Sequence, residues 1–306
     1  MKKKGQMVIF IVLGLVVLVI FGIVWFAKAS VANKSTEKQV EKAGQIAYEI
    51  EPLKKYAEAC LKIASERGLW ILGENGGYIS IDADPDYGET GTTNFLTYDG
   101  RKVPLYYSNG DMYPNLDQIK ARLERYILVE FQKCLQLNDF SEQGLTIKRP
   151  DINFSKANFI LDGLNVSSDV SINVDSVTVS VIYPMKARKK EYEASISEFR
   201  VYLPVRLGRI YNISADNTIG VLGIVKQKWN SGQQFQIGAD IHCEAIYDST
   251  GKINIYSSRG EDADRMRIIR VIDYSTYDNR FLKSYLFEWA IYKDAPINID
   301  EGGCAP

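Results

Sequence analysis

The chain has 306 residues, of which 46% are hydrophobic and 25% charged, and its formal net charge is −1. This balance excludes a disordered, collagen-like or low-complexity chain, and the near-zero charge argues against a nucleic-acid partner. One histidine, His242, and four widely spaced cysteines exclude histidine-rich metal sites and paired C-x-x-C zinc clusters. We therefore expect no metal and no cofactor.

A charge-free apolar segment near the N-terminus predicts a transmembrane helix. Residues 7–27 hold no charged side chain, and a helix of ~21 residues is roughly 30 Å long, the thickness of a bilayer core. Lys2, Lys3 and Lys4 precede the segment, and basic residues stay in the cytoplasm. We expect a cytoplasmic leader at residues 1–6 and an ectodomain outside the cell. Without the three lysines, the net charge of −1 becomes −4.

Two ordinary forms of processing fit this N-terminus. One is a plain signal anchor that stays uncleaved. The other is a secretory signal peptide, because Ala27-Lys28-Ala29 weakly matches a small-x-small cleavage site, although the apolar core is longer than such a peptide needs.

A third form of N-terminal processing is implied by a resemblance to a known family. Lys3-Lys4-Gly5-Gln6-Met7 places a basic pair and a glycine before the apolar run, which resembles the class III signal peptide of archaeal type IV pilins and archaellins. The resemblance implies cleavage between Gly5 and Gln6, after which the apolar helix packs in a filament core. It covers only the N-terminal segment, and Phe10 stands where bacterial pilins have a glutamate.

Helical spacing of apolar residues after the span predicts a long stem helix with one buried face. Pro52 is expected to kink or restart this helix, and we expect its end near Gly68. The predicted face comprises Ile46, Ile50, Leu53, Ala57, Leu61 and Ala64.

Turn and cap signals organise the next segment. Residues 73–77 predict a turn, residues 78–82 a strand and Asp99-Gly100 a hairpin. Asn115, with Gln118 three residues later, predicts the start of a second helix. Its apolar face comprises Leu116, Ile119, Leu123, Ile127, Phe131 and Cys134.

From about residue 145 the apolar period changes from 3.6 to 2, which predicts strands. Turns are expected at Asp175-Ser176 and Asp278-Asn279, and the basic run 186–190 is interpreted as a solvated turn. The apolar pattern of residues 210–225 is ambiguous and is compatible with a short helix. The predicted strands cover residues 170–174, 177–181, 199–207, 237–247, 252–257, 266–277 and 282–292.

These signals predict an α+β fold: an N-terminal transmembrane and stem helix, a second amphipathic helix, then a mostly antiparallel β-sheet ectodomain. We expect the stem helix, a loop with a hairpin and the second helix within residues 28–144. Residues 145–306 then form the β-rich extracytoplasmic part. One compact ectodomain and two closely packed subdomains both fit this pattern.

An even number of cysteines outside the span suits disulfides in an oxidising medium, and four cysteines allow three pairings. Cys60 and Cys134 lie on the apolar faces of the two predicted helices. We therefore expect a bond between them, which leaves Cys243 with Cys304. The alternative is that all four are small buried apolar residues. Four N-x-S sequons give candidate glycosylation sites, or simply surface asparagines, at Asn33, Asn153, Asn165 and Asn212.

Two clusters were weighed as chemical sites. Asp82, Asp84 and Asp86 alternate like calcium ligands, but Tyr87 stands where the EF-hand loop needs glycine, so an acidic surface turn is the preferred interpretation. His242 adjoins Cys243 in a predicted strand, where neighbours point to opposite faces. The sequence contains no nucleophile elbow, P-loop or zinc-protease motif, so we expect that the chain is not an enzyme. The nineteen tyrosines suit recognition or, preferably, sheet packing.

A second resemblance lies at the end of the stem helix. Glu58-Ala-Cys60-Leu61, Gly68-Leu69, Leu72-Gly73 and Gly76-Gly77-Tyr78-Ile79 resemble a family of uncharacterised archaeal membrane-anchored proteins. The resemblance implies a location and a lineage and no activity.

The first functional hypothesis is a pilin-like structural or adhesion subunit of a cell-surface filament or envelope assembly. Its partners would be the membrane, through residues 7–27, and either its own copies or other envelope proteins. The alternative is a single-pass anchored binding module that does not polymerise, and the least favoured is an extracytoplasmic enzyme. No nucleic acid is expected, and the sequence identifies no small-molecule substrate.

Overall fold

The structure, a computed structural model, describes residues 18, 19, 21, 50–87, 89–108, 110–150, 152, 166–190, 192–215, 220–230, 253–259, 266–278 and 283–292. The chain divides into two units: Met1–Pro52 with Arg188–Ala194, and Leu53–Ala187 with Ser195–Pro306. In the first unit, residues 50–52 are helical, and Lys190 lies in a turn between two strands with a φ of 53°. Apart from the helix and strand ends that residues 50–52, 188–189 and 192–194 contribute, the elements below belong to the second unit.

The first long helix covers residues 50–74 and ends in a Schellman cap. The N–H of Gly77 donates to the carbonyl of Leu72 at 2.7 Å, and the N–H of Gly76 donates to that of Gly73 at 3.1 Å. Gly76 has a φ of +51°, a left-handed conformation that glycine adopts at no steric cost. The expected turn at residues 73–77 is therefore the end of this helix.

The prediction that the helix ends near Gly68 was wrong. Gly68 lies within the helix, where a Cβ would come 2.7 Å from Cδ1 of Tyr126 and 2.9 Å from Cδ1 of Leu123. Glycine costs about 1 kcal/mol relative to alanine inside a helix. Here its missing side chain lets a second helix approach, and this contact is invisible in the local sequence pattern.

That second helix, α2 (Leu116–Cys134), begins at the expected capping box. The N–H of Gln118 donates to Oδ1 of Asn115 at 2.8 Å, and the N–H of Asn115 donates back to Oε1 of Gln118 at 3.0 Å. The helix buries Ile119, Leu123, Tyr126, Ile127, Leu128, Val129 and Phe131.

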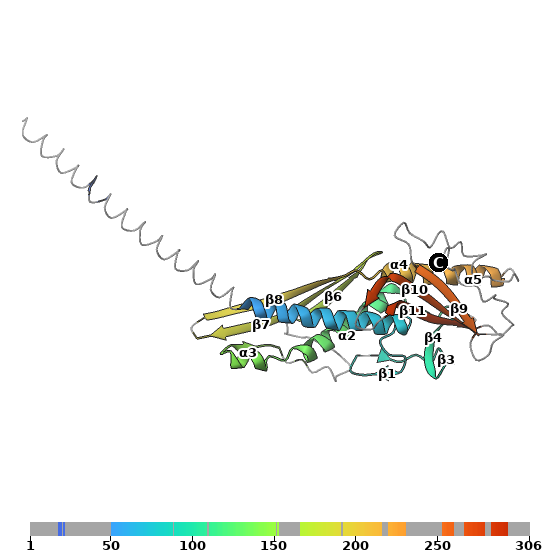
Figure 1. The fold of residues 1–306 in the computed structure, drawn as a ribbon, viewed down its shortest axis with the longest axis horizontal. Coiled ribbons are helices and arrows are strands. Elements are labelled where there is room, and N and C mark those ends of the chain that lie inside the picture. Colours follow the sequence, from blue (N-terminus) through green and yellow to red (C-terminus); the bar gives the residue numbers. More distant parts are fainter. Residues whose placement is uncertain are drawn as a thin grey trace, which may run out of the picture. The chain divides into compact units, whose positions relative to one another are not determined.

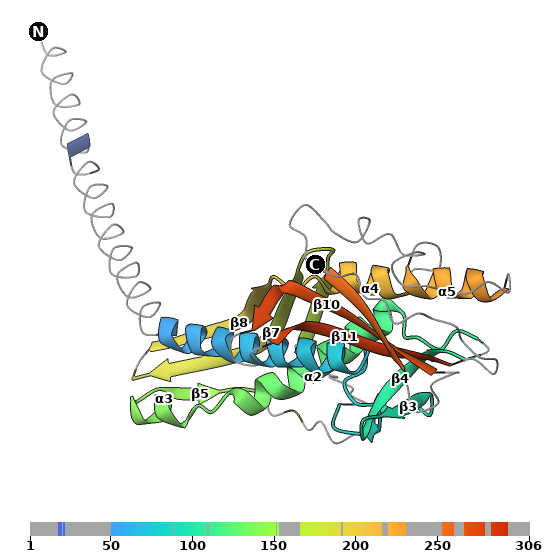
Figure 2. The same cartoon turned by 45° about the vertical axis from the view of Figure 1, so that its right-hand side comes forward.

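The two helices pack antiparallel. At one end a disulfide joins Cys60 to Cys134, the pairing expected from the sequence. At the other, a Cβ on Gly77 would lie 2.9 Å from Cδ1 of Ile119. Figures 1 and 2 show residues 50–74 running beside α2. The expected partners Cys243 and Cys304 lie outside the described residues.

One side of α2 packs on a four-stranded sheet. Its strands are β5 (Thr146–Lys148), β7 (Val177–Lys189), β6 (Ser167–Ile172) and β8 (Tyr192–Leu203), in the order β5-β7-β6, with β8 also paired to β7. The Phe131 ring lies 5.5 Å from that of Tyr183 and 5.7 Å from that of Phe199, measured between centroids. The expected turn at Asp175-Ser176 connects β6 to β7, which pair antiparallel.

Two boundaries in this sheet differ from the prediction. Strand β8 ends at Leu203 rather than at residue 207, because Pro204 has no N–H to continue a ladder. The basic run 186–190 is mostly the end of β7, and only Lys190 stands in the turn.

A five-stranded sheet has the order β3 (Phe95–Tyr98), β4 (Arg101–Tyr107), β11 (Lys283–Tyr292), β10 (Met266–Asp278), β9 (Ile253–Arg259). Asp99 and Gly100 form the expected hairpin turn with φ of 50° and 72°. The pairing of β10 with β11 is the expected antiparallel one, whereas β4 and β11 pair in parallel. This sheet therefore joins strands from both sides of residue 144.

The C-terminal end of the first helix packs directly on β11. A Cβ on Gly73 would lie 2.3 Å from the carbonyl oxygen of Leu286, and one on Gly76 would lie 2.5 Å from that of Glu288. The buried Tyr285 hydroxyl donates to the carbonyl of Leu69 at 3.2 Å. The main chain at the end of the first helix thus lies directly against the main chain of β11, and Gly73 and Gly76 make this close contact possible.

Residues 78–82 form no strand, contrary to expectation. Side chains satisfy the main chain of Ile79, since its N–H donates to Oε1 of Glu89 at 3.4 Å and its carbonyl accepts from Nδ2 of Asn75 at 3.2 Å. A short pair, β1 (Ala83–Asp84) and β2 (Glu89–Thr90), follows instead. The described residues also form the helices α3 (Asn138–Glu142), α4 (Leu207–Ala215) and α5 (Val221–Asn230). Helices α4 and α5 both overlap residues 210–225, the segment whose sequence pattern was ambiguous.

A buried ion pair fastens the junction of β8 and α4 to β10. Nε of Arg206 donates to Oδ2 of Asp273 at 2.9 Å, and neither residue is more than 6% exposed. Ser275 and Thr276 also donate to this carboxylate. Burial works to raise the pKa of Asp273, but these hydrogen bonds outweigh it and hold the pKa below its usual range.

The described part of the chain is therefore α+β with mainly antiparallel sheets, as predicted. The predicted span, residues 7–27, lies outside the described residues except for Leu18, Val19 and Phe21. No helix among the described residues is long and apolar enough to cross a membrane.

Replacing Cys60 and Cys134 together by serine should lower the free energy of unfolding by about 2–4 kcal/mol, because the bond closes a long loop of the unfolded chain. Urea titration of the full chain in detergent measures the change. An unchanged midpoint and slope would show that the bond contributes nothing.

Gly73→Ala should cost about 1–3 kcal/mol or more, since the new methyl group meets a main-chain carbonyl that cannot rotate away. Gly110→Ala is the matched control, because a Cβ there meets nothing within 4 Å. Thermal unfolding of both variants checks this, and equal melting temperatures would contradict the packing argument.

Candidate functional site

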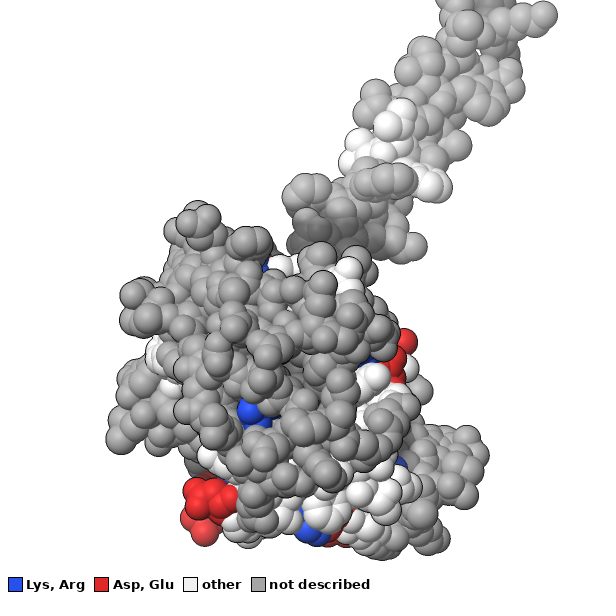
Figure 3. Space-filling model, turned by 90° about the vertical axis from the view of Figure 1, so that its right-hand side faces the viewer, with Lys and Arg blue, Asp and Glu red and all other residues white. Residues whose placement is uncertain are grey.

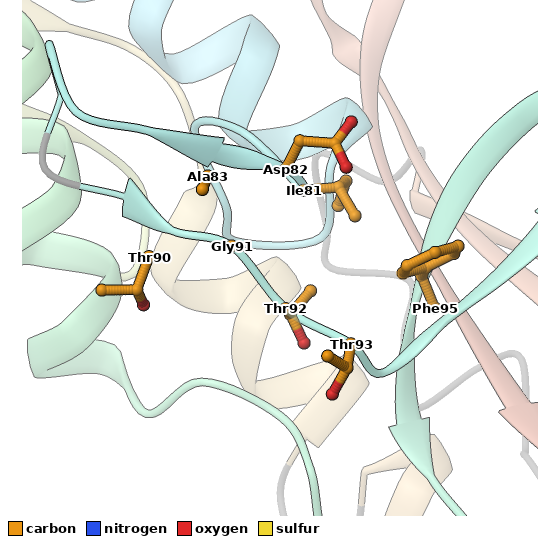
Figure 4. A pocket seen from close by; sticks show the side chains of 8 residues that line it. All are labelled: Ile81, Asp82, Ala83, Thr90, Gly91, Thr92, Thr93 and Phe95. Carbon is orange, nitrogen blue, oxygen red and sulfur yellow. The ribbon is translucent and has the colours of Figure 1, made fainter.

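The described surface is hollowed beside the β1–β2 pair. A cavity of about 480 Å³ is lined by Ile81, Asp82, Ala83, Thr90, Gly91, Thr92, Thr93 and Phe95. Figure 4 shows Ile81 and Phe95 on opposite sides of the opening, Thr92 and Thr93 along its lower edge and the Asp82 carboxylate above Ile81. This set of apolar groups, hydroxyls and one carboxylate defines the candidate site.

Main chain forms the floor of the cavity. Ala83 pairs with Thr90 across β1 and β2, and Thr92 N–H donates to the carbonyl of Ile81 at 2.8 Å. Gly91 has a φ of +74°, and a Cβ on it would lie 2.7 Å from the nitrogen of Ala83. The close approach of these two segments therefore requires glycine, and no side chain rises from the floor at this point.

One lysine neutralises the rim. Nζ of Lys102 contacts Oδ1 of Asp82 and lies 4.6 Å from the centroid of the Phe95 ring. Both side chains of the ion pair are more than a third exposed, so its contribution to stability is small. Lys102 thus balances the charge of Asp82, the only charged residue that lines the cavity.

A buried carboxylate, Glu89, adjoins the lining residue Thr90 in β2. Glu89 is 7% exposed and accepts from Nε of Arg122 at 3.3 Å, and the Arg122 guanidinium lies 4.2 Å from the centroid of Tyr78. Burial raises the pKa of Glu89 above its usual value, and the charge of Arg122 only partly opposes this. Burial also raises the pKa of Tyr78.

A second carboxylate, Glu130 on α2, holds the β1–β2 connection to the helix. The Tyr87 hydroxyl donates to Oε1 of Glu130 at 2.8 Å, and Nζ of Lys133 donates to the same oxygen at 2.9 Å. Burial works to raise the pKa of Glu130, but these two hydrogen bonds outweigh it and hold the pKa below its usual value.

Of the predicted site residues, the structure joins Cys60 to Cys134, but it does not bring the three aspartates of the calcium-like cluster together as a group of metal ligands. Asp82 is paired with Lys102, and Oδ1 of Asp84 accepts from the N–H of Asp86 at 3.1 Å. The described residues contain no group of three His, Cys, Asp or Glu that could hold a metal ion. Of the sequons, Asn212 is exposed on α4, but its companion Ser214 is fully buried. The other predicted site residues lie outside the described part of the chain: Gly5, Gln6, Asn33, Asn153, Asn165, His242, Cys243 and Cys304.

Sequence reasoning missed the threonines and Phe95 as parts of one cavity. The available signal was the Gly91-Thr92-Thr93 run, which follows the acidic segment from Asp82 to Asp86. Sheet and helix packing accounts for many of the tyrosines, because Tyr78, Tyr106, Tyr126, Tyr183 and Tyr285 are buried. On the face of the molecule in Figure 3, the basic and acidic side chains of the described residues stand in small separate groups.

Comparison with protein-family models, curated proteins and solved structures found no match to this chain. The two resemblances noted in the sequence therefore enter only as proposals.

The two carboxylates near the site should respond oppositely to pH. The pKa of Glu89 is raised by folding, so its favourable contribution is complete below the unfolded value of about 4.3 and is lost as pH rises through the folded pKa. The pKa of Glu130 is lowered, so its contribution is present above about 4.3 and is lost as pH falls through the folded pKa.

Glu89→Gln should therefore gain stability relative to wild type as pH rises from about 4, and Glu130→Gln should lose it. Unfolding free energies between about pH 3 and 7 measure both variants. Curves that shift in the same direction would contradict the assignment.

Proposed function

We propose that this chain is a membrane-anchored extracytoplasmic protein, a pilin-like structural or adhesion subunit of a cell-surface filament or envelope assembly. The observation that carries the proposal is the Cys60–Cys134 disulfide, which lies beyond a charge-free N-terminal segment in the chain. Disulfides persist in oxidising compartments and are rare in the cytosol. The bond thus favours the side of the membrane that the three N-terminal lysines also favour.

Three residues of the predicted span add support. Leu18, Val19 and Phe21 are helical, and their apolar side chains are 52–74% exposed. Such side chains are costly in water and suit either lipid or the apolar core of a filament. Both environments are compatible with the proposal.

The packing of residues 50–74 is a third support. A helix that follows an N-terminal anchor and lies against antiparallel sheets suits a subunit whose stem carries a β-rich head. The class III-like start, Lys3 to Gln6, supports the same interpretation by resemblance.

A second candidate, an anchored binding module that does not polymerise, is favoured by the cavity beside β1 and β2. The cavity offers polar and apolar groups on an exposed loop segment, a common arrangement for ligand recognition.

The test expresses the full chain in cells that contain a class III signal peptidase, followed by mass spectrometry of the N-terminal peptide from membranes and from sheared surface material. We expect a mature chain that begins at Gln6, and Gly5→Val should block the cut. Gly14→Val, within the apolar run, is the matched control and should leave the cut intact.

A mature chain that retains residues 1–5 in such cells removes the pilin interpretation. Electron microscopy then separates the remaining candidates, since filaments support a polymerising subunit and dispersed particles under all conditions support the binding module.

A further inference from the structure

The lining of the cavity beside β1 and β2 limits the charge of any ligand. Asp82 is its only charged residue, and Lys102 lies against that carboxylate. An anion entering the cavity meets the carboxylate, and a cation meets the ammonium group. The ion pair of Glu89, next to the lining residue Thr90, with Arg122 also has no net charge. The site therefore favours an uncharged ligand.

The remaining lining is amphiphilic. The half-buried Phe95 gives the apolar surface, with the 7% exposed Ile81 at its border, while Thr90 and Thr93 are exposed and carry hydroxyl groups. Thr92 already accepts from the N–H of Asn94 at 3.1 Å, and Lys102 contacts Oδ1 of Asp82, so the exposed threonines and Oδ2 of Asp82 are the better polar contacts. An uncharged ligand that matches this lining must carry an apolar face and several hydroxyl groups.

Sugars combine these properties, because a pyranose ring presents C–H groups on one face and hydroxyls around its edge. A volume of about 480 Å³ lies at the lower end of the usual range for ligand sites and suits one or two sugar rings. We propose that the cavity formed by residues 81–83 and 90–95 binds a neutral saccharide, with Phe95 beneath the ring and Thr93 and Asp82 bonding its hydroxyls. This inference rests on the proposed surface function and names the ligand class of its adhesive site.

The experiment is saturation-transfer NMR on the purified full chain with the methyl glycosides of glucose, galactose, mannose and N-acetylglucosamine. The detergent must carry no sugar headgroup, so an amine oxide replaces the common maltosides. We expect signals from at least one glycoside, with dissociation constants in the range of about 1 mM that small open sites reach.

Phe95→Ala should weaken that binding about tenfold, because the apolar platform is lost, and Thr93→Val should weaken it while keeping the side-chain volume. Thr146→Val on β5, an exposed threonine outside the cavity, is the matched control and should bind like wild type. Melting temperatures of the three variants identify any loss that comes from misfolding.

The proposal is overturned if none of the four glycosides gives a saturation-transfer signal, or if neither cavity variant reduces the signal. A stronger signal from the anionic N-acetylneuraminic acid or the cationic glucosamine overturns the assignment of a neutral ligand. The outcome is independent of leader cleavage and of filament formation, so a failure here is distinguishable from a failure of the proposed function.

Discussion

The close contact between the helix over residues 50–74 and α2 is the constraint on which the described fold depends. Gly68 allows the two axes to approach, and the Cys60–Cys134 bond fixes one end of the pair. Each helix then carries a different sheet: Phe131 of α2 packs on β7 and β8, whereas the end of the first helix packs on β11. A shift of one helix along the other would move one sheet relative to its partner, so the side-chain packing of both depends on this contact.

The ion pair of Arg206 with Asp273 fixes the same arrangement from another direction. It joins the segment after β8 to β10 and satisfies a buried carboxylate with an arginine and two hydroxyl side chains. Loss of one partner would leave the other buried without its counter-charge, which typically costs about 3–5 kcal/mol. The pair therefore specifies where β10 lies, whatever its net contribution to stability.

Local signals predicted the elements well and the contacts between elements poorly. The Asn115–Gln118 box and the Asp99-Gly100 turn act within a few residues, so their chemistry is legible in the sequence. The helix continues through Gly68 because α2 packs there, and α2 is distant in the chain. The main chain of Ile79 is satisfied by Glu89, which no helical or strand spacing relates to it. The cavity was missed for the same reason, because its walls are set by the fold of residues 81–95 against Lys102 and not by any motif.

The parallel pairing of β4 with β11 has a consequence for the order of assembly. Strand β11 lies between β4 and β10, yet it is the last described strand in the chain. The five-stranded sheet thus cannot close until residues 283–292 have been synthesised, and β3 and β4 must wait beside an open edge. Contacts between such distant segments slow folding. Because a chain is synthesised from its N-terminus, the early hairpin of β3 and β4 is the part most in need of protection from aggregation until β11 follows.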